Sequence, residues 1–276
     1  MINLKTMKVQ TSLYVVLASL FCFTIFASSL EARDYDFSLE MKGDSALILF
    51  PGATADFYVD FENSGDMEDS YMFYCMPVKE SLGWNIQGCF DFKGVCWGSQ
   101  TMNPETFAAG AGEEVHIQIF TPQDPGTIDG YLKVVSEATG TSQTVYYTVS
   151  NETSPAIRTL VFTNKDHYKA GDTLVVSLRN VNLGEFQNVD TYVAVISGPT
   201  VLFFKMNRDV LELSADVGPY KRNNAYFSGV VSEEVVLSLP LETSLGIDNL
   251  IFASVMANAG TTEILTEISS TVVTFE

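Results

Sequence analysis

The chain contains only two histidines, so few of its side chains could exchange protons near neutral pH. His116 stands on the polar face of an alternating segment, between Glu114 and Gln118, and His167 stands in a predicted loop, 164–171. We expect both side chains to be solvated rather than to act as a base or as a metal ligand. No glycine-rich phosphate loop, metal-binding cluster or signature of paired catalytic carboxylates accompanies them in the sequence.

Carboxylates gather in one short stretch and could offer oxygen ligands to calcium, which takes about six to eight of them. Tyr71 stands where a helix-loop-helix calcium site would need a bidentate glutamate. We therefore interpret the stretch as a solvated turn and keep its carboxylates as calcium candidates. These candidates are Asp60, Glu62, Asp66 and Asp69.

The N-terminal residues follow the order of a secretory signal peptide, which is basic, then apolar, then small. Lys5 and Lys8 precede the uncharged run 13–27, which as a helix would be about 22 Å long, short of the roughly 30 Å hydrocarbon core. We expect residues 1–32 to be removed on export, which leaves no membrane span and places the mature chain at the cell surface, in the periplasm or outside. An uncleaved anchor is the alternative.

The mature chain is strongly acidic and holds an odd number of cysteines. Residues 33–150 carry 18 acidic and 5 basic side chains, and residues 151–276 carry 15 and 8. Such a surface repels nucleic acid, so we expect no nucleic-acid partner. Solubility explains the acidity, and an acidic patch for cations or a basic partner is the alternative. The three cysteines after the signal, 75, 89 and 96, predict one disulfide and one free thiol.

Apolar and polar residues alternate throughout the mature chain, which is typical of strands with one buried face. Short turns separate the alternating runs, and no window of twelve or more residues holds a helical apolar stripe. The sequence therefore predicts an all-β fold of sandwich type. The clearest apolar rows are Phe57, Val59 and Phe61; Val115, Ile117 and Ile119; and Leu174, Val176 and Leu178.

A polar run at 150–155 separates two predicted strands, 143–149 and 158–163, and suits an exposed junction. We therefore expect two tandem immunoglobulin-like β-sandwich domains, 33–150 and 151–276. The junction also contains the glycosylation sequon Asn151-Glu152-Thr153.

Residues 51–149 resemble a bacterial extracellular immunoglobulin-like module of the type associated with alpha-galactosidases. The matching segments are Pro51-Gly52-Ala53-Thr54-Ala55, Phe61-Glu62-Asn63-Ser64-Gly65-Asp66, Gly83-Trp84, Phe107-Ala108-Ala109-Gly110-Ala111-Gly112-Glu113-Glu114-Val115 and Pro125-Gly126-Thr127-Ile128-Asp129-Gly130-Tyr131. In physical terms these are turns that lead into strands, together with a core tryptophan at position 84.

The resemblance also implies a disulfide, because the family often carries a cysteine pair shortly after the tryptophan. Cys89 and Cys96 stand where that pair would be, which would leave Cys75 as a buried thiol. Bridges from Cys75 to either of the other two cysteines remain open. Residues 158–276 are similar, more loosely, to C-terminal β-sandwich modules of secreted bacterial proteins, on the segments Tyr168-Lys169-Ala170-Gly171-Asp172-Thr173 and Val189-Asp190-Thr191-Tyr192-Val193-Ala194-Val195.

A second resemblance points to hydrolysis, but its partners are missing. Gly43-Asp44-Ser45-Ala46-Leu47 nearly matches the nucleophile motif of the Gly-Asp-Ser-Leu hydrolases, which need an α/β scaffold and a downstream aspartate and histidine. Asp166 and His167 are the only downstream candidates, and no helices are predicted. We therefore expect Ser45 to lie in a turn between strands.

The family resemblance implies a non-enzymatic structural or recognition protein without a cofactor. We expect a surface or adhesion component whose partner is a protein or polysaccharide at the cell surface, or another copy of the chain. Two alternatives are a filament subunit joined by edge-strand pairing and a carbohydrate-binding accessory module. The carbohydrate module would use exposed aromatic rings, for which Tyr58, Tyr146 and Tyr147 are the candidates.

Overall fold

The computed structural model describes residues 35–79, 82–98, 102–207, 210–242 and 249–276. Within these ranges the chain forms strands and one short 3-10 turn, η1 at Asp91–Lys93, so the predicted all-β fold is confirmed. No helix of the described ranges is long and apolar enough to span a bilayer. The predicted signal peptide, 1–32, lies outside the described residues.

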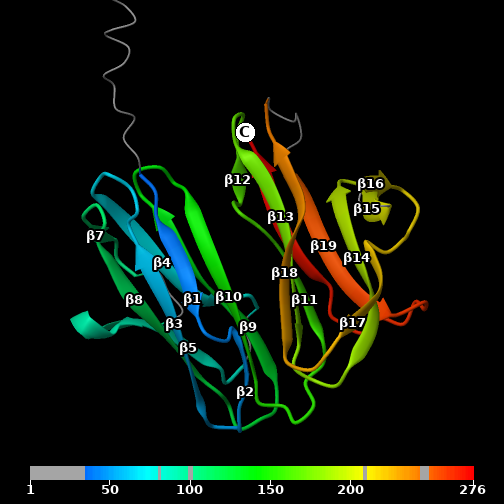
Figure 1. Cartoon of the computed structure of the whole chain (residues 1–276), viewed down its shortest axis with the longest axis horizontal. Helices are drawn as coiled ribbons and strands as arrows, with labels where there is room; N and C mark the ends of the chain where they lie inside the picture. Colours follow the sequence, from blue (N-terminus) through cyan, green and yellow to red (C-terminus); the bar gives the residue numbers. More distant parts are fainter. Residues whose placement is uncertain (1–34, 80–81, 99–101, 208–209, 243–248) are drawn as a thin grey trace, which may run out of the picture.

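Residues 35–150, the N-terminal half, form two five-stranded sheets (Figure 1). One has the order β1-β3-β8-β5-β6 and the other β2-β10-β9-β4-β7, where β2 runs parallel to β10. The strands are β1 Ser38–Lys42, β2 Ala46–Ile48, β3 Thr54–Glu62, β4 Asp69–Pro77, β5 Asn85–Phe90, β6 Val95–Trp97, β7 Glu105–Phe107, β8 Gly112–Phe120, β9 Thr127–Ser136 and β10 Ser142–Ser150.

Residues 151–276, the C-terminal half, form a three-stranded sheet, β11-β13-β18, and a seven-stranded sheet. The larger sheet follows the path β12-β20-β19-β14-β15-β16, with β17 paired to β14. The strands are β11 Arg158–Thr163, β12 His167–Tyr168, β13 Thr173–Asn182, β14 Gln187–Ser197, β15 Thr200–Asn207, β16 Val210–Ser214, β17 Lys221–Tyr226, β18 Val230–Pro240, β19 Asn249–Asn258 and β20 Ser269–Phe275.

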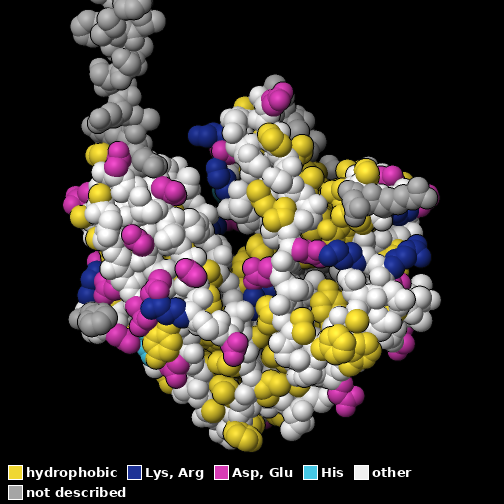
Figure 2. Space-filling view, in the orientation of Figure 1, with side chains coloured by type: hydrophobic (Ala, Val, Ile, Leu, Met, Phe, Trp, Pro, Cys, Tyr) yellow, Lys and Arg dark blue, Asp and Glu magenta, His cyan; other side chains and the backbone are white. Residues whose placement is uncertain are grey.

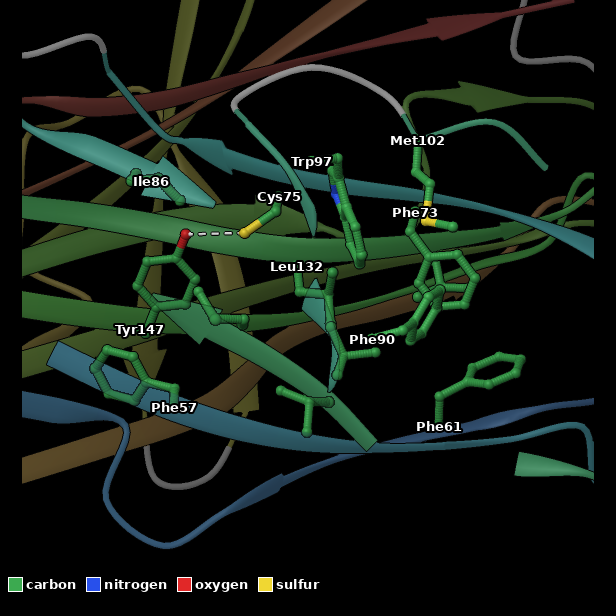
Figure 3. Close-up of a cluster of buried hydrophobic side chains, with 14 of the residues drawn as sticks. Phe57, Phe61, Phe73, Cys75, Ile86, Phe90, Trp97, Met102, Leu132 and Tyr147 are labelled. Atoms are coloured by element: carbon green, nitrogen blue, oxygen red, sulfur yellow. Dashed lines mark hydrogen bonds between the residues drawn. The ribbon is translucent and has the colours of Figure 1, made fainter. Parts of the chain in front are cut away.

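The alternation in the sequence sets which face of each strand is buried. In β3, Phe57, Val59 and Phe61 are buried, and the residues between them are exposed. A shift of one residue would turn all three side chains to solvent, so this pattern fixes the register of β3 against β8. The buried side chains of the two sheets meet in a core rich in aromatic rings (Figure 3).

Each half has its own buried clusters. The core of the N-terminal half is formed by residues between 37 and 149. In this core, the centroid of the Phe61 ring lies 4.8 Å from the centroid of the Phe107 ring and 5.2 Å from that of the Phe73 ring. Two clusters of the C-terminal half are drawn from residues 157–273. Trp97 is the fully packed tryptophan, whereas Trp84, the predicted core tryptophan, is only partly buried against the same cluster.

The segment between β10 and β11 is only partly the exposed junction that the sequence predicted, because Thr153 and Ser154 are exposed but Asn151 is not. Asn151 is buried, and its side-chain amide donates to the carbonyl oxygens of Pro122 (2.8 Å) and Asp124 (3.1 Å). Its Oδ1 accepts from the N–H of Gly126 (2.6 Å). Because the amide is enclosed by these partners, the sequon at Asn151 is not an accessible glycosylation site in the folded chain.

Candidate functional site

A disulfide-closed hairpin forms one end of the first sheet. Cys89 on β5 lies directly opposite Cys96 on β6, and the two form a disulfide, so the pairing implied by the family resemblance is confirmed. The residue before Cys89 is Gly88. A larger residue would not fit at this position, because its Cβ would come within 2.5 Å of the Trp97 ring. The hairpin carries η1, whose Lys93 ammonium lies 3.0 Å from Glu105 and 3.2 Å from Glu113.

His116 lies beneath that turn, and the prediction that it is solvated was wrong. The residue is 8% exposed because η1 and the ring of Tyr58 cover it. Nε2 lies 2.8 Å from Asp56 Oδ1, and Nδ1 lies 3.1 Å from Asp91 Oδ2. Both ring nitrogens are therefore occupied by carboxylates, so this histidine ties the turn to the sheet rather than serving as an open base. His167 is exposed, as predicted, and contacts Thr274 Oγ1 at 2.5 Å.

Ser45 lies in the turn between β1 and β2, as predicted, and is held by the other half of the chain. Arg179 on β13 donates from Nη2 to the Ser45 carbonyl oxygen (2.9 Å) and contacts its Oγ (3.0 Å). Nη1 of the same guanidinium lies 2.5 Å from Glu233 Oε1. No histidine is among these partners, so the hydroxyl lacks the base that a nucleophilic serine requires.

An ion pair also joins the halves. Asp129 on β9 accepts from Arg158 Nε (2.6 Å) and from Thr148 Oγ1 (2.8 Å). Asp129 is 4% exposed, and Arg179 is 1% exposed. We call Ser45, Arg179, Asp129 and Arg158 the clasp.

Weaker contacts surround the clasp along a furrow between the halves, which is visible in Figure 2. Lys133 lies 2.7 Å from Asp166, and the ring of Tyr146 lies 4.4 Å from that of Phe162. The furrow is lined by β9 and β10 on one side and by β11 and the start of β20 on the other. The clasp residues thus lie in a continuous band of contacts between the two halves.

The structure separates the calcium candidates. Asp60 points to Lys42 (2.6 Å) on the outer face of the first sheet, whereas Asp69 is buried and contacts Ser136 Oγ at 2.5 Å. Glu62 is exposed at the end of β3, and Asp66 lies in the following turn. Among the described residues, no three histidine, cysteine, aspartate or glutamate side chains come together in a way that could hold a metal ion.

The three tyrosines proposed for carbohydrate binding do not share a face. Tyr147 belongs to the core, where its ring stacks on Phe57 at 5.2 Å. Tyr146 packs in the furrow, and Tyr58 lies on the opposite sheet against His116. Since β10 alternates, neighbouring tyrosines at 146 and 147 had to point to opposite faces. They form no common platform for a sugar.

Cys75 is a buried free thiol, as the resemblance implied. Its Sγ lies 3.7 Å from the hydroxyl of Tyr147, the contact drawn as a dashed line in Figure 3. Burial raises the pKa of Cys75 to about 12 and raises the pKa of Tyr147 well above its usual value. The thiol therefore stays neutral at physiological pH and is a poor nucleophile.

Comparison with known proteins gives the chain no family. No family model and no curated protein matches it. Among solved structures, a family 123 glycoside hydrolase from Clostridium perfringens is 10% identical, with 44% of this chain and 28% of that chain covered and a TM-score of 0.31. A PapD-like domain of human CEP192 is 14% identical, with 41% and 82% covered and a TM-score of 0.25. The YadV chaperone is 9% identical, with 85% and 99% covered and a TM-score of 0.27.

The chain therefore spans little more than a quarter of the hydrolase's length, and likenesses this remote say nothing of activity. The narrower resemblance to alpha-galactosidase-associated modules stays a prediction.

Sequence reasoning missed the clasp. The segment Leu174–Asn182 contains apolar and small polar residues except for Arg179. This single charged residue in a predicted buried strand is the signal that could have identified Arg179. Its partner Ser45 is 134 residues away, and no local pattern connects the two.

Proposed function

We propose that this chain is an exported, non-enzymatic structural or recognition protein in which two domains, 33–150 and 151–276, are held as one rigid unit at the cell surface. The clasp carries the proposal. Arg179 and Asp129 are buried polar groups, and each has a hydrogen-bonding partner from the other half. Separating the halves would break the contacts of Arg179 with Ser45 and of Asp129 with Arg158, so these contacts favour one relative orientation of the halves.

A fixed orientation suits a protein that presents loops and edge strands to a partner. A binding surface that spans two loosely joined domains must be ordered when the partner binds, and that ordering lowers affinity. The clasp removes this cost beforehand. The partner would be a protein or polysaccharide of the cell surface, including a second copy of the chain.

The proposed location is supported by three features. The Cys89–Cys96 disulfide is a type of bond that persists in oxidising compartments. The sequence before residue 33 has the order of a signal peptide, and the mature chain keeps a strong negative charge.

The experiment labels intact native cells with a membrane-impermeant amine reagent and captures the chain with a specific antibody after mild surface cross-linking. We expect labelled chain that carries cross-linked surface material. A chain that is labelled only after lysis would contradict the location. Turnover of esterase or glycosidase substrates by the purified mature chain, abolished by Ser45→Ala, would contradict the non-enzymatic role.

A further inference from the structure

We propose that β16 is a self-association edge, at which two copies of the chain join their seven-stranded sheets by antiparallel pairing of β16 with β16. This inference rests on the proposed function and names the strand and the partner. β16 is the last strand on the path of its sheet and pairs only with β15 among the described strands. Its free backbone groups are available to another strand.

The other described edges are protected in ways that β16 is not. β17 pairs only with β14 and carries two basic residues, Lys221 and Arg222. β2, β6, β7 and β12 have only two or three residues. β1 has five residues, as β16 does, but it carries Lys42 in ion pairs with Asp60 and Glu114. β11 lies against β19 and β20, and its Val161 N–H donates to Ser269 Oγ (3.0 Å). Short length, charge and cover all prevent pairing at an edge.

β18 is the longest edge strand, and it shows three protective features together. Glu233 and Glu234 are engaged by Arg179 and Lys221, Pro240 ends the strand, and a bulge interrupts its register with β13. Charges, proline and bulges each discourage a further strand. β16 has no proline or bulge, and Glu212 is its one charged residue.

The side chains of β16 favour association instead. Val210 and Leu213 are 59% and 55% exposed although they lie in a strand. Leu213 stands opposite the buried Phe204 on β15, so it lies at the open margin of the core. Leu211 shares that face and packs partly against the same core.

The strand is also complementary to itself. Full antiparallel overlap about a two-fold axis at Glu212 sets Leu211 opposite Leu213 of the second copy and Val210 opposite its Ser214. The leucines of both copies would then form one continuous apolar row. The axis brings the two Glu212 carboxylates together, and each of them lies opposite Lys205 on its own β15. Across the dimer, the two negative glutamates are therefore flanked on each side by a positive lysine. We therefore infer a weak dimer that the glutamate pair restrains.

The test uses sedimentation velocity of the purified mature chain, from residue 33, over a range of concentrations. We expect reversible dimers. Leu213→Lys should weaken dimerisation about tenfold or more, and Glu212→Gln should strengthen it several-fold. Val235→Lys on β18 is the matched control, because Val235 is 58% exposed on another edge strand. It should leave the dimer unchanged.

A cross-linking arm tests the register and does not depend on the leucine variants. Residues that face each other across antiparallel strands have Cα atoms about 4.5–5.5 Å apart, within disulfide range. Glu212→Cys should therefore give a disulfide-linked dimer under mild oxidation, and Ser238→Cys on β18 should not. Circular dichroism confirms that each variant is folded.

Three results would overturn the proposal: a chain that stays monomeric up to about millimolar concentration, equal loss of dimer in Leu213→Lys and Val235→Lys, or cross-linking at position 238 that equals that at 212. These measurements use purified chain, so their failure is distinct from a failure to find the chain at the cell surface.

Discussion

The guanidinium of Arg179 donates to the carbonyl oxygen of Ser45, a residue 134 positions earlier in the chain and in the other half of the molecule. Arg179 is among the largest fully buried side chains, and its charge is balanced by Glu233. A long-range contact of this kind makes the two halves depend on each other for stability.

Arg179→Ala should lower the free energy of unfolding by about 2–3 kcal/mol, because the hydrogen bonds of a charged guanidinium to the Ser45 carbonyl oxygen and Oγ are lost. Denaturant titration measures this loss. Arg222→Ala, at an exposed arginine on β17, is the control and should change stability by less than about 0.5 kcal/mol. Equal stability of the two variants would show that the clasp does not hold the halves.

Reduction of the Cys89–Cys96 disulfide, or its replacement by serines, should cost about 2–3 kcal/mol in the chain-entropy model for so short a loop. The loss should include the packing of Trp97, which lies beside the bridge on β6. A lower melting temperature together with a red shift of tryptophan fluorescence would report both effects. Trp84→Phe is the background in which to measure the shift, and an unchanged spectrum would contradict the prediction.

Asn151→Ala should destabilise the chain by about 2–3 kcal/mol, because three hydrogen bonds of its buried side chain are lost. The matched control is Asn103→Ala, at an exposed asparagine, which should be nearly neutral. Thermal unfolding compares the two variants. If both are neutral, Asn151 does not hold the loop that contains Pro122 and Asp124.

The chain should lose stability at alkaline pH through Cys75. Burial raises the thiol pKa from 9.0 to about 12, so the unfolded chain ionises first. The contribution of the neutral Cys75 thiol to the free energy of unfolding is complete below pH 9 and is lost progressively as pH rises from 9 towards 12. Cys75→Ala should therefore show a smaller fall in denaturation midpoint than the parent between about pH 8 and pH 11.

Reactivity provides the second measurement for Cys75. At pH 8 the native thiol should react with a thiol reagent far more slowly than the same thiol in denaturant. Rapid labelling of the native chain would contradict the buried, neutral state.

Alternation predicted the all-β fold because period-two burial is a local property that the residues of a single strand express. The predicted strand 158–163 has the bounds of β11, and Ser45 fell in the predicted turn. The disulfide came from family resemblance, since three cysteines alone allow three pairings.

The failures concern residues whose surroundings come from distant parts of the chain. The position of His116 in the alternating pattern predicts a solvated side chain, yet η1 and Tyr58 cover it. Asn151 looks like a polar linker residue, yet a loop almost thirty residues earlier encloses it. The case of Tyr147 is local. Alternation along β10 places Tyr146 and Tyr147 on opposite faces of the strand, so only one of them can be exposed to a sugar.

The contact between Arg179 and Ser45 also means that the turn before β2 draws its partners from two distant parts of the chain. Thr148 N–H donates to the Ser45 carbonyl oxygen from the same half, whereas the guanidinium comes only with β13. A truncated chain that ends before β13 would therefore have this turn held by its own half alone.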